Sequence, residues 1–320
     1  MALFYVAHRL FAAHDRAVGA YVASRLASAA GSENVFLPFC DTDEENLVAD
    51  CKGLRLFELD RARLRRLSGM IAVLHGPSLD DGVCMEIGFA VASGVPVVLL
   101  STDFQTYTPT AGSPVMAFPD PLLENVAVAV ARAYRIGSSG LGAEADRFRA
   151  FLKQNLGPVR AATTQAVAAL MCSVRQEARV RPRDPARVPL AFIEPSPYLP
   201  DDMWTGISAT LRARGWQVHA AQRFQTGVGT AEAAQADWAA ATAASLAVVD
   251  VRGPETPPGA ALVIGACAAA GVPVLAAHPG TWPTLADGRE PNWRNLMIQY
   301  AVRGRFTSVS QFTSALGGLS

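Results

Sequence analysis

The residues of this chain best suited to chemistry lie in the stretch Leu79–Ala90. Two of its three carboxylates, Asp80 and Glu86, stand six positions apart. The apolar run Met70–Leu74 before it predicts a buried strand, and the small and apolar residues Cys84–Ala92 predict a helix. Acids that follow a strand of an open α/β sheet lie where such folds place their sites. A carboxylate there can act as a nucleophile or exchange protons.

Each of the two acids also has an interpretation without chemistry. Glu86, near the start of the predicted helix, could be a solvated first-turn acid that complements the helix dipole. The same dipole would favour the anionic form that a nucleophile needs. Asp80, just before the helix, is placed to cap it, and capping is compatible with binding a ligand or positioning Glu86.

The same stretch recurs in degraded form 177 positions later. Shifting residues 68–97 by this offset aligns them without a gap, and 11 of the 30 positions are identical. Most of the identities are glycines and prolines, which recur because the backbone path is shared. The acids do not recur, because Pro257 stands opposite Asp80 and Val263 opposite Glu86. The sequence therefore indicates two copies of one fold, of which only the first has kept the chemistry.

The repeat and the composition breaks predict three segments: a catalytic domain over 1–135, a helical insert and linker over 136–187, and a degenerate copy over 188–320. The expected fold is α/β, with two Rossmann-like or flavodoxin-like domains of mainly parallel sheets arranged as a pseudo-dimer. Flexible residues Gly137–Gly140 end the first domain, two helices separated by Gly157–Pro158 form the insert, and Arg179–Pro189 is the linker. Further elements are expected, in chain order, at Leu3–Ala7, Asp15–Ala30, Val35–Leu37, Leu59–Leu67, Val97–Leu100, Leu190–Ile193 and Val309–Leu316.

Composition excludes several classes of function. Apolar residues make up 50% and charged residues 18%, which suits buried parallel strands covered by helices. With a net charge of zero, the chain lacks the excess of basic residues that is typical of nucleic-acid binding. No apolar run reaches the roughly 18 residues that would predict a membrane span. Five cysteines without paired spacing, and a start without a charged region, favour a reduced cytoplasmic protein. The histidines show no metal spacing and Gly227–Gly229 is too short a motif for a dinucleotide, so we expect no metal and no cofactor.

The pattern Asp80-x-Gly82-x-x-x-Glu86-x-Gly88 after an apolar strand resembles the signature of the nucleoside 2-deoxyribosyltransferase family. The string Leu-Asp-Asp-Gly followed by Glu-Ile-Gly-Phe is especially similar to the bacterial members. The resemblance covers about residues 1–135 and, more weakly, 188–320, but not the insert. Five further residues match family motifs in order and spacing: Tyr5 in the first strand, Phe11 six positions on, Asp60 before the motif, and Asn295 with Met297 in a late Asn-Leu-Met.

The resemblance implies cleavage of an N-glycosidic bond through a glycosyl-enzyme intermediate on Glu86, with configuration retained. It implies that Asp80 binds the sugar or positions Glu86, and that Asp60 exchanges protons with the base. Asp237 persists at the position equivalent to Asp60 in the half without a nucleophile, so a helix-capping role would explain both. Tyr5 could steer Glu86 through its hydroxyl or simply fill the core. The implied partners are a nucleoside or nucleotide and a free nucleobase, with a homo-oligomer left open.

The chain departs from the family around the first strand. His8 and Arg9 stand where small residues are usual, and they could bring positive charge to the sugar or its 5′ end. Phe11 could stack on a base or simply pack. Gly82 is followed by Val83 instead of a hydroxyl residue. The first half also shows Ser113–Met116 where Asn-Leu-Met is expected.

In the family, the Asn of Asn-Leu-Met reaches into a neighbouring subunit's site. In this chain the acids remain only in the first half and Asn295-Leu-Met297 only in the second. These complementary losses predict that the halves pack as an internal pseudo-dimer, with Asn295 completing the pocket around Glu86. The alternative is that Asn295 is a turn or capping residue.

Three functions remain open at this point. The leading one is transfer of deoxyribose between nucleobases. An N-glycosidase for nucleosides or nucleoside 5′-monophosphates would use the same Glu86 and differ only in admitting water. The third is a non-catalytic module that binds or senses nucleotides, and the degenerate second half favours this alternative.

Overall fold

A computed structural model describes residues 2–42, 47, 49–109, 111–133, 146–174, 188–199, 202–225, 229–278, 280 and 291–319. The predicted break Gly137–Gly140, most of the linker and residues 227–228 lie outside these ranges. No helix in the described part of the chain is long and apolar enough to cross a bilayer.

The first half is a five-stranded, fully parallel sheet in the order β2-β1-β3-β4-β5. Its strands are β1 (Phe4–Ala7), β2 (Val35–Phe36), β3 (Gly69–Val73), β4 (Val97–Ser101) and β5 (Ala129–Arg132). One face is covered by α1 (Ala13–Ala30), which runs into the short 3-10 helix η1 (Ser32–Asn34), and by α5 (Arg147–Ser173). The other face is covered by α2 (Lys52–Leu64), α3 (Asp81–Ala92) and α4 (Pro121–Val126).

The second half repeats this topology, with strand order β7-β6-β8-β9-β10. Its strands, again parallel, are β6 (Leu190–Glu194), β7 (Gln217–Ala220), β8 (Leu246–Asp250), β9 (Val274–Ala277) and β10 (Gly304–Phe306). The outer helices are α6 (Met203–Ala213) and α10 (Val309–Gly317); the inner ones are α7 (Thr230–Ala243), α8 (Pro258–Ala270) and α9 (Leu296–Ala301). The predicted class, two Rossmann-like or flavodoxin-like α/β domains, is confirmed.

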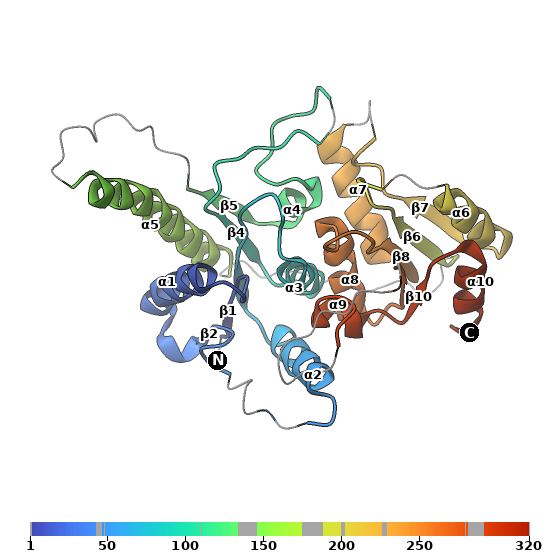
Figure 1. Ribbon diagram of the computed structural model, residues 1–320, viewed down its shortest axis with the longest axis horizontal. Coiled ribbons are helices and arrows are strands. Elements are labelled where there is room, and N and C mark those ends of the chain that lie inside the picture. Colours follow the sequence, from blue (N-terminus) through green and yellow to red (C-terminus); the bar gives the residue numbers. More distant parts are fainter. Residues whose placement is uncertain are drawn as a thin grey trace.

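The two halves face each other through their inner helices, as Figure 1 shows with α3 and α8 side by side. One apolar cluster fills the space between the two sheets and takes residues from both halves. The helices touch at two glycines: a Cβ on Gly88 would overlap the carbonyl oxygen of Leu262, and one on Gly265 would overlap that of Met85. The repeat offset turns the first contact into the second, so α3 and α8 cross on a pseudo-two-fold axis. The halves therefore form an internal pseudo-dimer.

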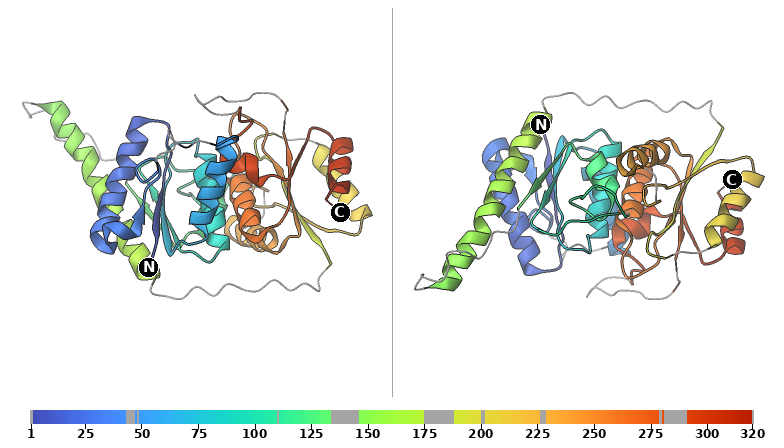
Figure 2. Two further views of the ribbon diagram at one scale, coloured as in Figure 1. Left: turned by 90° about the horizontal axis from the view of Figure 1, so that it is seen from below. Right: turned by 90° about the horizontal axis from the view of Figure 1, so that it is seen from above.

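Helix α5 differs from the expected pair of short helices. It runs without a break through Gly157 and Pro158, because solvent around its exposed first half can hydrate the carbonyl group that a proline leaves unpaired. Its second half packs Ala162, Ala166 and Leu170 on the first sheet. In Figure 2 its first half projects beyond the body of the molecule. This helix is thus an outer layer of the first half.

Candidate active site

A cavity of about 930 Å³ opens at the carboxyl ends of β1 and β3, between the two halves. All ten residues singled out from the sequence line it: Tyr5, His8, Arg9, Phe11, Asp60, Asp80, Gly82, Glu86, Asn295 and Met297. The second half also contributes Gly253–Glu255, His278 and Asn292–Arg294. The cavity is therefore shared by both copies of the fold.

Glu86 lies in the second turn of α3 and is only 8% exposed. The Tyr5 hydroxyl, from β1, donates a 2.8 Å hydrogen bond to its Oε1. Burial raises the pKa of Glu86 well above its ordinary value, the charge of Asp60 raises it further, and the Tyr5 hydrogen bond lowers it. Glu86 is therefore not a solvated first-turn acid. The Tyr5 hydrogen bond is the contact that favours its ionised form against burial and the charge of Asp60.

Tyr5→Phe tests this role of the hydroxyl. Hydrogen bonds to charged groups contribute roughly 1.5–3 kcal/mol, which corresponds to about one pKa unit or more. Without the donor, the pKa of Glu86 rises further, so the acidic limb of a pH–rate profile is expected to move about one unit to higher pH. Profiles of kcat for the two proteins measure the shift, with Tyr21→Phe on α1 as the control. An unmoved limb would show that Tyr5 only packs.

Asp80 and Asp81 line the cavity at the start of α3. Asp80 is the helix N-cap and accepts a 2.9 Å hydrogen bond from the amide of Val83, while Arg9 lies 3.8 Å from its other oxygen. Burial raises the pKa of Asp80. Asp81, which the sequence did not single out, has a pKa raised to about 6 by burial and by the neighbouring charge of Asp80. Asp81 is therefore an acid at the cavity whose pKa lies close to neutral.

Asp60 lies inside α2, which begins at Lys52, seven residues before the predicted start. Its Oδ1 accepts a 2.8 Å hydrogen bond from Arg63, whose guanidinium lies over the ring of Phe36; that ring stacks on Tyr5. Asp60 lies in the interior of α2 and caps none of the described helices, so the capping explanation was wrong for it. It was wrong for Asp237 too, which lies inside α7 and accepts loop amides after β7.

The loop after β1 carries less positive charge into the cavity than expected. His8 is buried against α1, and burial lowers its pKa, so the imidazole is neutral near pH 7. The Arg9 guanidinium donates to the carbonyl of Ser78 at 3.2 Å and lies 3.6 Å from Glu255 of the second half. Phe11 is 78% exposed at the cavity mouth, so it is not a core residue.

Asn295 combines the two roles weighed for it. Its Oδ1 caps α9 by accepting the amide of Met297 at 3.0 Å. Its Nδ2 faces α3 so closely that a Cβ on Gly82 would lie 2.6 Å away. The structure thus brings a side chain of the second half to the helix that carries Glu86.

The counterpart of Asn295 in the first half is Asp120, not the predicted Ser113–Met116. Asp120 caps α4 through the amide of Leu122, at 2.9 Å, and its other oxygen meets Gly259, the counterpart of Gly82. Met116 instead pairs with Tyr107 in an isolated bridge. The sequence did not reveal this correspondence, because Asp120-Pro-Leu and Asn295-Leu-Met have no identical residue at equivalent positions and their offset is not 177.

The model of the nucleoside 2-deoxyribosyltransferase family matches residues 4–171, which is more than half of the chain. The chain belongs to this family. Its members are glycosyltransferases that act on nucleosides. The family match extends past residue 135, where the motif-based resemblance ended, and includes most of α5.

A solved structure gives a second comparison. A conserved protein from Enterococcus faecalis V583 is 32% identical over 32% of this chain and 64% of its own, with a TM-score of 0.28. The chain thus spans less than two thirds of that relative. No curated protein matches the chain.

The family motifs leave out part of the second half's contribution to the cavity. Arg294 donates to the carbonyls of Val251 and Gly253, which fixes the loop after β8, and Trp293 packs edge-on against His278. None of these residues carries a spacing signal in the sequence. Among the described residues, no group of three His, Cys, Asp or Glu side chains could hold a metal ion.

Proposed function

We propose that the protein cleaves the N-glycosidic bond of a 2-deoxynucleoside through a covalent intermediate on Glu86, and transfers the deoxyribose to another base. One observation carries this proposal: the Glu86 carboxyl is buried at a ligand-sized cavity and accepts a hydrogen bond from Tyr5. A carboxylate held in this way is suited to attack an anomeric carbon. Membership of a family that acts on nucleosides supports the choice of substrate.

In the proposed reaction the Glu86 carboxylate attacks C1′ of the sugar. The C1′–N bond breaks, its electron pair passes to the departing base, and Asp60, which must be in its acid form for this step, gives its proton to that base and becomes a carboxylate. The second base then attacks C1′, releases Glu86 and gives its proton back, so two displacements retain the configuration. Asp80 and Asn295 orient the sugar from the two sides of the cavity.

Incubation with a deoxynucleoside, with and without a second base, tests the proposal. We expect a new nucleoside only when the second base is present. Free base formed equally in both samples would identify a hydrolase. Binding without turnover would identify a sensing module and overturn the proposal.

A second candidate is an N-glycosidase for nucleoside 5′-monophosphates, which would pass the sugar to water. Two observations favour it. The ion pairs of Arg9 with Asp80 and Glu255 are long, at 3.8 and 3.6 Å, so the guanidinium can exchange them for a phosphate. The cavity, at about 930 Å³, also lies near the upper end of the range of roughly 300–1,000 Å³ for ligand pockets.

Arg9→Ala separates the two substrates. If Arg9 binds a 5′-phosphate, the variant is expected to lose about tenfold or more in kcat/KM for the monophosphate, because a charge-assisted hydrogen bond contributes about 1.5–3 kcal/mol. Its kcat/KM for the nucleoside should change little. Steady-state kinetics on both substrates measure the difference, with Arg25→Ala on the exposed side of α1 as the control. Equal kcat/KM for both substrates, unchanged in the variant, would rule out the monophosphate as the preferred substrate.

A further inference from the structure

The pseudo-two-fold axis relates the cavity around Glu86 to a second position in the other half. Gly259 is the counterpart of Gly82 there, and each glycine faces the cap of a helix from the opposite half. The two acids are replaced by Pro257 and Val263. The second position has therefore lost its nucleophile but kept the backbone frame of a ligand site.

The strand register extends this correspondence to the first strand of each half. Tyr5 of β1 pairs with Met70, while Phe192 of β6 pairs with Ala247, which lies 177 positions after Met70. Phe192 is thus the counterpart of Tyr5 and lacks its hydroxyl. The group that holds Glu86 is missing together with Glu86 itself.

The next strands correspond as well. Tyr5 stacks on Phe36 of β2 with ring centres 5.5 Å apart, and Phe192 stacks on His219 of β7 at 5.6 Å. The loop after β2 borders the open cavity of the first half. The corresponding loop after β7 carries Arg223. Arg223 therefore approaches the second position from the side on which the first cavity is open.

The Arg223 guanidinium occupies the second position. Its Nη2 is the atom nearest to where a Cβ on Gly259 would stand, followed by an oxygen of Asp120. In the first half the corresponding space beside Gly82 and Asn295 belongs to the open cavity. The side chain of Arg223 is fully buried. It stands where a ligand would stand in the first half.

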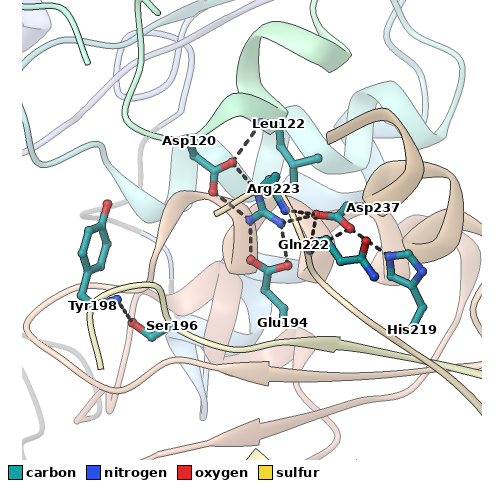
Figure 3. Close-up of polar contacts among 9 residues, drawn as sticks. All are labelled: Asp120, Leu122, Glu194, Ser196, Tyr198, His219, Gln222, Arg223 and Asp237. Carbon is teal, nitrogen blue, oxygen red and sulfur yellow. Dashed lines mark hydrogen bonds and ion pairs between the residues drawn. The ribbon is translucent and has the colours of Figure 1, made fainter. Parts of the chain in front are cut away.

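Three carboxylates surround the guanidinium, as Figure 3 shows. Asp120 takes two hydrogen bonds, from Nε at 2.8 Å and Nη2 at 2.9 Å. Glu194 accepts from Nη1 at 3.0 Å and from Nη2, and Asp237 accepts from Nη1 at 3.3 Å. Asp120 belongs to the first half and the other three residues to the second. The cluster therefore links the halves through a parallel, two-bond pair of the kind that a planar guanidinium makes.

We propose that Arg223 is a resident occupant of the second ligand site, which closes that site and locks the two halves together through Asp120. The chain then has one working site. The lock and the Asn295 contact are symmetry counterparts, so each half is anchored to the other at two related points.

Arg223→Ala, followed by addition of guanidinium, tests the proposal by thermal unfolding. Removing one partner leaves buried carboxylates uncompensated, so the unfolding midpoint is expected to fall by about 5–10 °C. Guanidinium chloride at low millimolar concentration should refill the cavity and restore at least half of that loss. Ammonium chloride at the same concentration should not, because it lacks the planar fork. Arg212→Ala on the exposed side of α6 is the matched control and should respond to neither salt.

If Arg223→Ala does not fold, Arg223→Lys and Asp120→Asn carry the test. Each keeps a polar partner but loses the paired geometry or the charge, so both should lower the midpoint, and the double variant should lower it less than the sum of the two. A midpoint equal to that of Arg212→Ala, strict additivity, or equal rescue by both salts would overturn the proposal. None of these measurements involves a nucleoside, so their outcome is independent of the proposed activity.

Discussion

Glu86→Gln is expected to lower turnover by at least about 10³-fold, because the amide cannot form the glycosyl-enzyme bond. It is also expected to make the protein more stable at neutral pH. Burial raises the pKa of Glu86 far above its unfolded value of about 4.3. Ionising the group in the fold therefore requires energy that a neutral amide does not, and activity and stability should change in opposite directions.

The stability gain should depend on pH in a defined way. Below the unfolded pKa, Glu86 is protonated in both states and the variant has no advantage. Between the unfolded and folded pKa values the folded protein binds the extra proton, so wild-type stability falls as pH rises. The advantage of Glu86→Gln should thus grow upward from about pH 4.5. Denaturation midpoints from pH 4 to 9 measure it.

Glu58→Gln serves as the control, because this glutamate on α2 is exposed and forms a surface pair with Arg55. Its stability should follow that of the wild type at all pH values. A Glu86→Gln protein that keeps more than about a tenth of the wild-type rate would contradict the covalent mechanism. A variant less stable than the wild type at pH 8 would contradict the assignment of Glu86 as a buried acid with a raised pKa.

The repeat made much of the fold predictable. Glycines and prolines mark turns and close approaches, so their recurrence alone aligned the residues of β3 with those of β8, and α3 with α8. The identical Gly88 and Gly265 turned out to be the pair that lets α3 and α8 cross. Glycines and prolines that the backbone path requires recur at fixed spacing, and the prediction of two similar halves rested on this recurrence.

The remaining parts depend on contacts between distant residues, which leave no such pattern. Asp120 and Arg223 meet only because the halves pack face to face, and neither lies in an identical position of the repeat. Glu86 is buried because helices of the other half cover α3. A proline normally ends a helix, so the continuity of α5 was also hidden, since only its exposed setting permits it.

The final expectation concerns Asn295 as a residue shared between the halves. Asn295→Ser keeps the cap of α9, because serine is as good an N-cap as asparagine, but it removes the amide that faces Gly82. If Asn295 orients the ligand, kcat/KM should fall about 10- to 100-fold while thermal stability stays within about 2 °C. If capping were its whole purpose, activity would be unchanged.

Gly82→Ala approaches the same contact from the first half. Its Cβ would stand 2.6 Å from the Asn295 amide and must displace it, so kcat/KM should fall by a similar factor. Because both substitutions remove one contact, the double variant Gly82→Ala/Asn295→Ser should be no worse than the more damaged single variant. Losses that multiply would mean that the two residues act separately. Non-additive losses across residues 213 positions apart would instead tie the second half directly to the site, and explain why a copy without its own acids has kept Asn295.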